Sequence, residues 1–106
     1  MNKNNKKALG LVAVGDEVKN KIYVLREEKV MFDFDLAELY QVTTGALNQA
    51  VKRNRERFPA DFVFTLNKAE EANLKSQFVI SNYGRRRPIA AFTEQGIAML
   101  SGVLFI

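Results

Sequence analysis

The residues with the clearest chemical potential lie between residues 44 and 57. Asn48 and Gln49 carry amides that can hydrogen-bond to adenine, and Lys52 can reach guanine or a phosphate. Four basic residues stand against one glutamate between residues 52 and 57, a composition suited to phosphate contacts. We predict contacts near DNA bases for Thr44, Gly45, Asn48 and Gln49, and phosphate contacts for Lys52, Arg53, Arg55 and Arg57.

A first helix is predicted to position this segment from its N-terminal side. Leu36, Leu39 and Tyr40 recur at the spacing of one helical face. Asp33 or Asp35 is placed to cap the N-terminus of this helix, where an acidic side chain also interacts favourably with the helix dipole.

A second helix is predicted after a tight turn. Thr43 or Thr44 can cap it, and Leu47, Ala50 and Val51 form its inner face. Two helices joined in this way have the layout of a helix-turn-helix, whose second helix enters the major groove of DNA. A helix hairpin with a polar outer face also occurs without DNA binding, so the pattern alone leaves that interpretation open.

A second basic site is predicted in the loop that contains Arg85, Arg86 and Arg87. Strand-forming residues at 77–80 and 89–92 flank the loop, so we expect a hairpin that acts as a wing. Arginines in such a wing can hold phosphates or enter the minor groove. A solvated hairpin tip is an equal alternative for the same residues.

The remaining patterns predict short strands and two more helices. Residues 22–25 and 29–32 favour a β-hairpin, and 61–66 favours a third strand. A capping box opens a helix over 67–74, and a last helix follows Thr93. The expected fold class is α+β: a helix-turn-helix with small antiparallel β-hairpins, similar to a winged helix.

Length and composition narrow the classes of function. The chain has 106 residues, a net charge of +4 and a pI of about 9.5, which suits a polyanionic partner. It lacks cysteine and histidine, so thiolate catalysis, serine–histidine triads and nearly all zinc sites are excluded. We expect neither a cofactor nor a metal site. No apolar run is long enough to span a membrane, and a cytoplasmic protein is expected.

The domain organisation follows from the same patterns. Residues 1–20 are predicted to be a flexible N-terminal lead-in, in which 8–15 could form a short strand. Residues 21–106 are predicted to be one DNA-binding domain. The sequence ends on an apolar stretch, which suggests that a C-terminal domain follows.

Several ordered motifs resemble one family, the phage ORF-six N-terminal domain, a relative of the KilA-N domains of phage antirepressors. The resemblance implies an α+β DNA-binding module at the N-terminus of a phage or prophage regulatory protein, for instance an antirepressor. Gln41 departs from the family, which tends to have glycine before Val42 because the turn requires a left-handed backbone. The motifs are DLAELY at 35–40, LNQAVKRN at 47–54, RFPADF at 57–62, GRR at 84–86 and FTEQGIAMLS at 92–101.

Three functional hypotheses follow. The first is sequence-specific binding of double-stranded DNA, in which a homodimer on a palindromic site is left open. The second is a protein-interaction module that captures a repressor or another partner without binding DNA, and the sequence does not separate these two. The third is a metal-dependent nuclease built on Asp33, Asp35 and Glu38, which we disfavour because the first two are expected near a helix cap and Glu38 in solvent.

Overall fold

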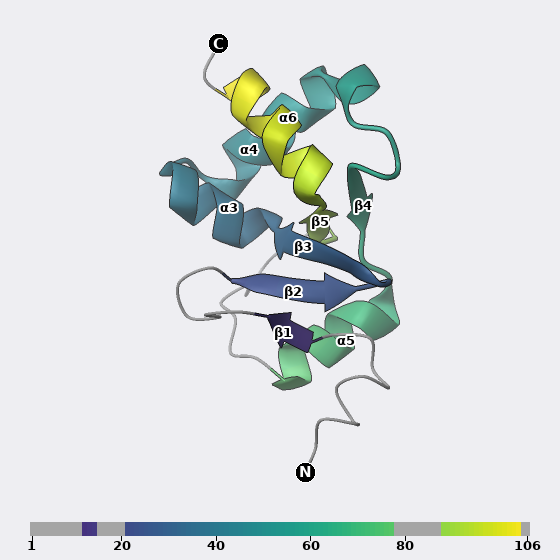
Figure 1. The fold of residues 1–106 in the computed structure, drawn as a ribbon. Coiled ribbons are helices and arrows are strands. Elements are labelled where there is room, and N and C mark those ends of the chain that lie inside the picture. Colours follow the sequence, from purple (N-terminus) through teal and green to yellow (C-terminus); the bar gives the residue numbers. More distant parts are fainter. Residues whose placement is uncertain (1–11, 15–20, 78–87, 105–106) are drawn as a thin grey trace.

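The structure, a computed structural model, describes residues 12–14, 21–77 and 88–104 and has an α+β fold, as predicted (Figure 1). The strands are β1 (Val12–Val14), β2 (Ile22–Leu25), β3 (Glu28–Phe32), β4 (Val63–Thr65) and β5 (Ala90–Phe92). The helices are α3 (Asp33–Tyr40), α4 (Thr44–Arg53), α5 (Lys68–Gln77) and α6 (Glu94–Leu104), with a 3-10 helix η1 (Arg55–Arg57) after α4.

The strands form one antiparallel sheet in the order β1-β2-β3-β5-β4. The predicted return strand is confirmed as β5. Its two edges pair with β3 and β4. The predicted strand at 77–80 is wrong at Gln77, which is the last residue of α5. The rest of that strand and the predicted wing residues Arg85, Arg86 and Arg87 lie outside the described residues.

The sheet carries a hydrophobic cluster on each face. Side chains alternate across a strand, so Ala91 of β5 faces α5 and packs in a cluster with Leu74. Phe92 joins the opposite cluster with Leu47 of α4 and Leu100 of α6. Figure 1 shows α3, α4 and α6 on one side of the sheet and α5 on the other.

Two turns adopt the left-handed backbone conformation without glycine. Arg26 and Glu27 have φ angles of 55° and 64°, as a two-residue hairpin turn of type I′ requires, and this turn confirms the predicted hairpin. Gln41 ends α3 with φ 59° and ψ 45°, and its backbone N–H bonds back into the helix. The left-handed conformation expected before Val42 is therefore present.

The start of α3 differs from the prediction. Its N-cap is Phe32, which makes no side-chain capping bond, and both Asp33 and Asp35 lie inside the helix and are buried. β3 runs directly into α3, so the acidic side chains point into the domain. In α4 the expected cap is confirmed, because Thr43 Oγ1 accepts a hydrogen bond from the N–H of Ala46 at 3.0 Å.

The C-terminal helices begin as predicted. Asn67 and Glu70 form a reciprocal capping box at the start of α5, with hydrogen bonds of 2.9 and 2.8 Å. Before α6, the backbone N–H of Thr93 donates to the carbonyl of Phe62 at 3.0 Å. A side chain at Gly96 would overlap that same carbonyl group, so α6 packs against the turn before β4 at a distance that only glycine allows.

Candidate functional site

Helices α3 and α4 are joined by a short turn, and the outer face of α4 is basic, without an acidic residue. Leu47 and Ala50 are buried on the inner side of α4, as predicted. Gln49, Lys52 and Arg53 are exposed on its outer side. The sequence of α4 contains no acidic residue, and its last turn contains two basic ones. This face therefore offers hydrogen-bond donors and positive charge to a partner.

Asn48 was predicted on the outer face of α4, but its side chain is half-buried and forms hydrogen bonds within the domain. Its Nδ2 donates to Oδ2 of Asp33 at 3.1 Å and to the carbonyl of Thr44 at 3.1 Å. Both amide protons are thus engaged, which leaves Oδ1 as its free hydrogen-bonding atom. A bidentate pair with adenine needs a free N–H as well, so Asn48 cannot form one in this conformation.

Asp33 is the partner that the sequence did not reveal. Its carboxylate is fully buried, and its Oδ2 also accepts a hydrogen bond from the backbone N–H of Ala90 at 3.3 Å. Asp33 therefore connects the start of α3 to α4 and to β5. Asn48 and Ala90 are far from Asp33 in sequence, so no local pattern indicates these contacts.

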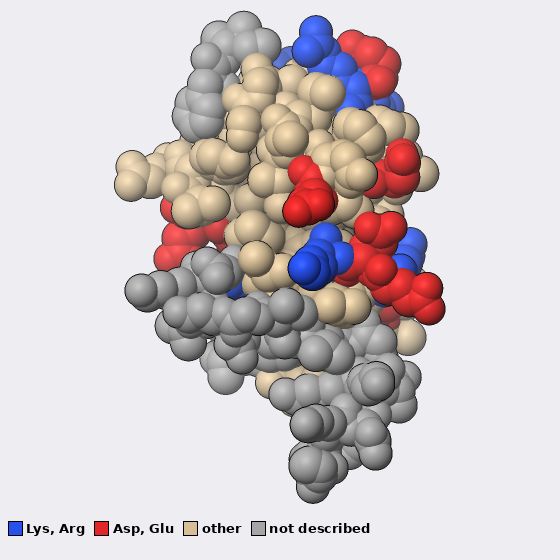
Figure 2. All heavy atoms as spheres, in the orientation of Figure 1, with Lys and Arg blue, Asp and Glu red and all other residues tan. Residues whose placement is uncertain are grey.

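The other predicted residues are placed as follows. Thr44 and Gly45 are half-buried in the first turn of α4, whereas Arg55 and Arg57 are exposed in η1. Within the described ranges, none of the four basic residues from 52 to 57 forms an ion pair. Figure 2 shows basic side chains gathered over the end of α4 and η1, with acidic side chains beside them.

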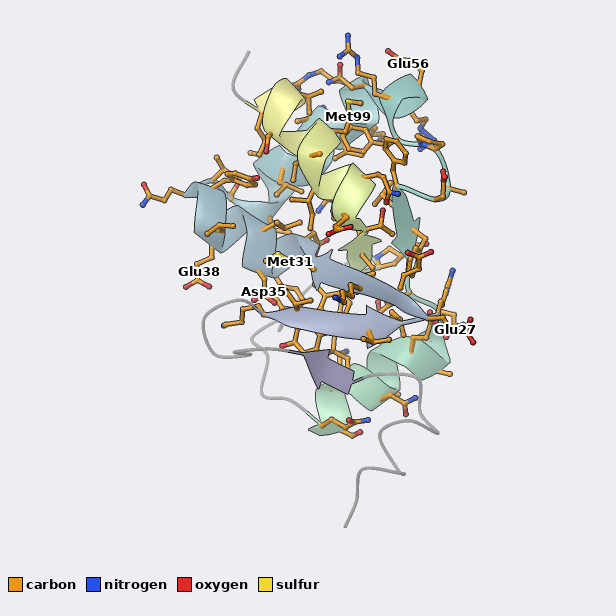
Figure 3. All side chains as sticks on the ribbon, in the orientation of Figure 1. Glu27, Met31, Asp35, Glu38, Glu56 and Met99 are labelled. Atoms are coloured by element: carbon orange, nitrogen blue, oxygen red, sulfur yellow. The ribbon has the colours of Figure 1, made fainter. Side chains whose placement is uncertain are left out.

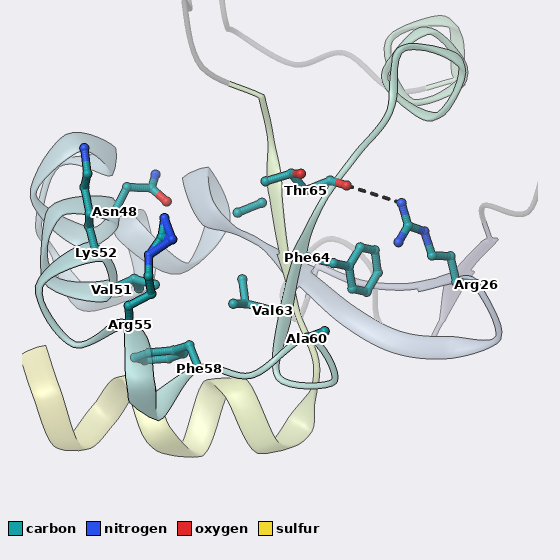
Figure 4. A pocket seen from close by; sticks show the side chains of 11 residues that line it. Arg26, Asn48, Val51, Lys52, Arg55, Phe58, Ala60, Val63, Phe64 and Thr65 are labelled. Atoms are coloured by element: carbon teal, nitrogen blue, oxygen red, sulfur yellow. Dashed lines mark hydrogen bonds between the residues drawn. The ribbon is translucent and has the colours of Figure 1, made fainter.

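A groove of about 580 Å³ lies between the C-terminal half of α4 and strand β4. Figure 4 shows Asn48, Lys52 and Arg55 on its α4 side and Phe58 at one end. The apolar side chains of Val51, Phe58 and Val63 contribute to its lining, as do Arg26, Phe64 and Thr65 on the far side.

The far side of the groove has its charge neutralised. The guanidinium of Arg26 binds both carboxylate oxygens of Glu70 at 2.9 and 3.0 Å and donates to the carbonyl of Thr65 at 3.3 Å. It also lies 4.2 Å from the ring centre of Phe64. The hydrogen bond from Arg26 lowers the pKa of Glu70, so this pair stays ionised. The unpaired charge of the groove is consequently on its α4 side.

A second buried carboxyl, Asp35, lies under α3 toward β2 (Figure 3). Burial raises its pKa to about 6, and the nearby acidic groups of Glu38 and Asp33 add to this effect. Lys21, whose Nζ is 3.8 Å from Oδ1 of Asp35, acts in the opposite direction. Glu38 itself is exposed, and in the part of the chain that the structure describes no three acidic residues are grouped to hold a metal ion.

The fold and this site define an α+β module in which a short-turn helix pair presents a basic helix. The chain belongs to the ORF6N domain family, whose sequence model matches residues 20–103. No curated protein and no solved structure matches the chain. Within the ranges that the structure covers, no helix is long and apolar enough to cross a membrane.

Proposed function

We propose that this domain binds double-stranded DNA in a sequence-specific manner, without catalysis, as part of a phage or prophage regulatory protein of the antirepressor type. The observation that supports this most directly is the exposed, acid-free face of α4. A helix with such a face, preceded by a short turn and a supporting helix, suits insertion into the major groove. Membership of the ORF6N family supports the phage setting.

We propose different tasks for the residues of α4 and η1, on the basis of their exposure and hydrogen bonds. The exposed amide of Gln49 can pair with adenine through both of its atoms. Asn48 can only accept, so it suits a base that offers an amino group, namely cytosine through N4 or adenine through N6. Thr44 and Gly45 would lie near the groove wall. Phosphate contacts are assigned to Lys52, Arg53, Arg55 and Arg57, and also proposed for Arg85, Arg86 and Arg87.

The test is the salt dependence of binding to a random-sequence duplex. Four phosphate contacts from the basic residues at 52–57 would make log K fall against log salt with a slope of about −3.6. The double variant Lys52→Gln/Arg53→Gln should flatten this slope by about 2. Lys29→Gln/Lys68→Gln is the matched control, because it removes the same charge from exposed positions in β3 and α5 and should leave the slope unchanged.

Base reading is tested separately on sites selected from a random library. Gln49→Ala should relax the preference at one position and keep the salt slope of the unmodified chain, because phosphate contacts carry that slope. Absence of binding by the unmodified chain at low salt would contradict the proposed function.

A further inference from the structure

Strand β4 is the edge strand of the sheet on the side of the groove. The N–H of Leu66 donates to the carbonyl of Ile89 at 2.9 Å, which fixes the hydrogen-bonded pairs between this segment and β5. Hydrogen-bonding direction alternates along a strand. The backbone groups of Val63 and Thr65 therefore point away from β5, out of the sheet.

Two of those four outward groups are already occupied. The N–H of Val63 donates to the carbonyl of Pro59 at 3.3 Å, and the carbonyl of Thr65 accepts from Arg26 at 3.3 Å. Within the described residues, the carbonyl of Val63 and the N–H of Thr65 have no partner. In a parallel ladder, the added residue opposite Phe64 donates its N–H to the carbonyl of Val63. Its own carbonyl accepts a hydrogen bond from the N–H of Thr65. The open pair thus matches a single residue of a parallel strand opposite Phe64.

We propose that this groove binds an extended, acidic segment of a partner protein, which adds to β4 as a parallel strand. Side chains on one side of the segment would face Lys52 and Arg55, whose charges are unpaired in the described structure. The methylene groups of these side chains of the bound segment would lie over Val51 and Phe58 (Figure 4). Strand addition at a sheet edge takes affinity from backbone hydrogen bonds and specificity from alternate side chains.

This inference goes beyond the proposed function. Lys52 and Arg55 serve both the peptide and the proposed DNA surface, so an acidic segment in the groove would compete with DNA. The competition would let a partner protein displace the domain from its site.

The probe is a fluorescein-labelled, acetylated peptide of alternating glutamate and valine, titrated with the full chain and followed by fluorescence anisotropy. With valine opposite Phe64, the glutamates face Lys52 and Arg55. N-methylation of the valines removes the N–H that reaches the carbonyl of Val63 and should weaken binding about fivefold or more. N-methylation of the glutamates removes N–H groups that point to solvent and should have a small effect.

Two pairs of variants test the same contacts from the protein side. Thr65→Pro removes the outward N–H, a change that an edge strand accommodates, whereas Thr65→Val keeps it. The proline variant should weaken the peptide about fivefold and the valine variant should not. Lys52→Gln/Arg55→Gln should weaken the peptide, whereas Arg53→Gln/Arg57→Gln, which removes equal charge outside the groove, should weaken DNA alone.

The outcomes separate the two proposals. Saturable peptide binding that depends on the valine N–H groups and on Thr65 supports the inference, even if the chain fails to bind DNA. DNA binding without peptide binding overturns it. Equal sensitivity to methylation of the valines and of the glutamates overturns it as well. So do equal losses in Lys52→Gln/Arg55→Gln and Arg53→Gln/Arg57→Gln, because the peptide would then be bound through general charge attraction.

Discussion

Asp33 and Asp35 are two residues apart in α3, and both are buried, but their surroundings differ. Asp33 accepts hydrogen bonds at one oxygen from the side chain of Asn48 and the backbone of Ala90. Asp35 has an ion pair to Lys21 at 3.8 Å and no hydrogen bond to its carboxylate in the described structure. Each of the two residues keeps one buried oxygen without a hydrogen-bond donor there, Oδ1 in Asp33 and Oδ2 in Asp35, so the difference lies in the bonds at the other oxygen.

The difference shows how burial of a carboxylate is made tolerable. Donated hydrogen bonds replace the water that Oδ2 of Asp33 loses, and they also join α3 to α4 and β5. Asp35 lacks that replacement, and its pKa rises to about 6 because the charged form is disfavoured by burial. Asp33 thus joins the two helices, and Asp35 makes the stability of the domain depend on pH.

Removal of the Asp33 carboxylate should have the largest effect. Asp33→Ala leaves the amide of Asn48 and the N–H of Ala90 without this acceptor in the interior, so we expect a loss of about 3 kcal/mol in the free energy of unfolding. Urea denaturation measures it. Asp33→Asn, which retains an acceptor oxygen, is the control and should lose less. A loss below about 1 kcal/mol for the alanine variant would mean that Asp33 does not join these elements.

The partner side of the same contact should have a smaller effect. Asn48→Ala leaves the N–H of Ala90 in place as a donor to Asp33, so we expect a loss of about 1.5 kcal/mol. Gln49→Ala, a neighbouring exposed amide, is the matched control and should stay within about 0.5 kcal/mol. A double-mutant cycle between Asp33 and Asn48 should give a coupling of about 1 kcal/mol, and additive losses would contradict the bond.

These contacts also mark where sequence reasoning succeeds and where it stops. The cap at Thr43 and the inner face of Leu47 and Ala50 depend on residues within a few positions, so their pattern is visible in the sequence. The bond between Asp33 and Asn48 depends on how α3 crosses α4, which no local spacing encodes. For that reason the local pattern predicted Asn48 on the outer face and Asp33 or Asp35 at a cap.

The groove was missed for the same reason. It forms because η1 directs the chain back beside β4, and β4 lies at the sheet edge only because β5 is inserted between β3 and β4. The sequence predicted a strand over 61–66, which includes Val63, and a phosphate contact for Arg55. These residues come together beside the open edge of β4 only because of the order of the strands in the sheet.

The ionisation of Asp35 should produce an effect that depends on pH. Its pKa in the folded chain is about 6, above the ordinary 3.8, so the folded state binds this proton more tightly than the unfolded state does. The contribution of Asp35 to stability is therefore greatest below about pH 4 and falls as pH rises to about 6. Asp35→Asn should remove this fall, as urea denaturation at a series of pH values would show. Parallel pH profiles for the two proteins would contradict the assignment.

The smallest effect is expected from the partner of Asp35. Lys21 stabilises the charged carboxylate across 3.8 Å at a partly exposed position, so Lys21→Gln should cost about 0.5 kcal/mol at pH 8. Without the ammonium the pKa of Asp35 should rise further, and the fall in stability should extend to higher pH. Lys21→Arg keeps the charge, and both variants keep a non-glycine side chain at this positive φ of 55°, so backbone strain is matched between them. If glutamine and arginine gave the same pH profile, the charge of Lys21 would not act on Asp35, and burial with the neighbouring acidic groups would account for its raised pKa.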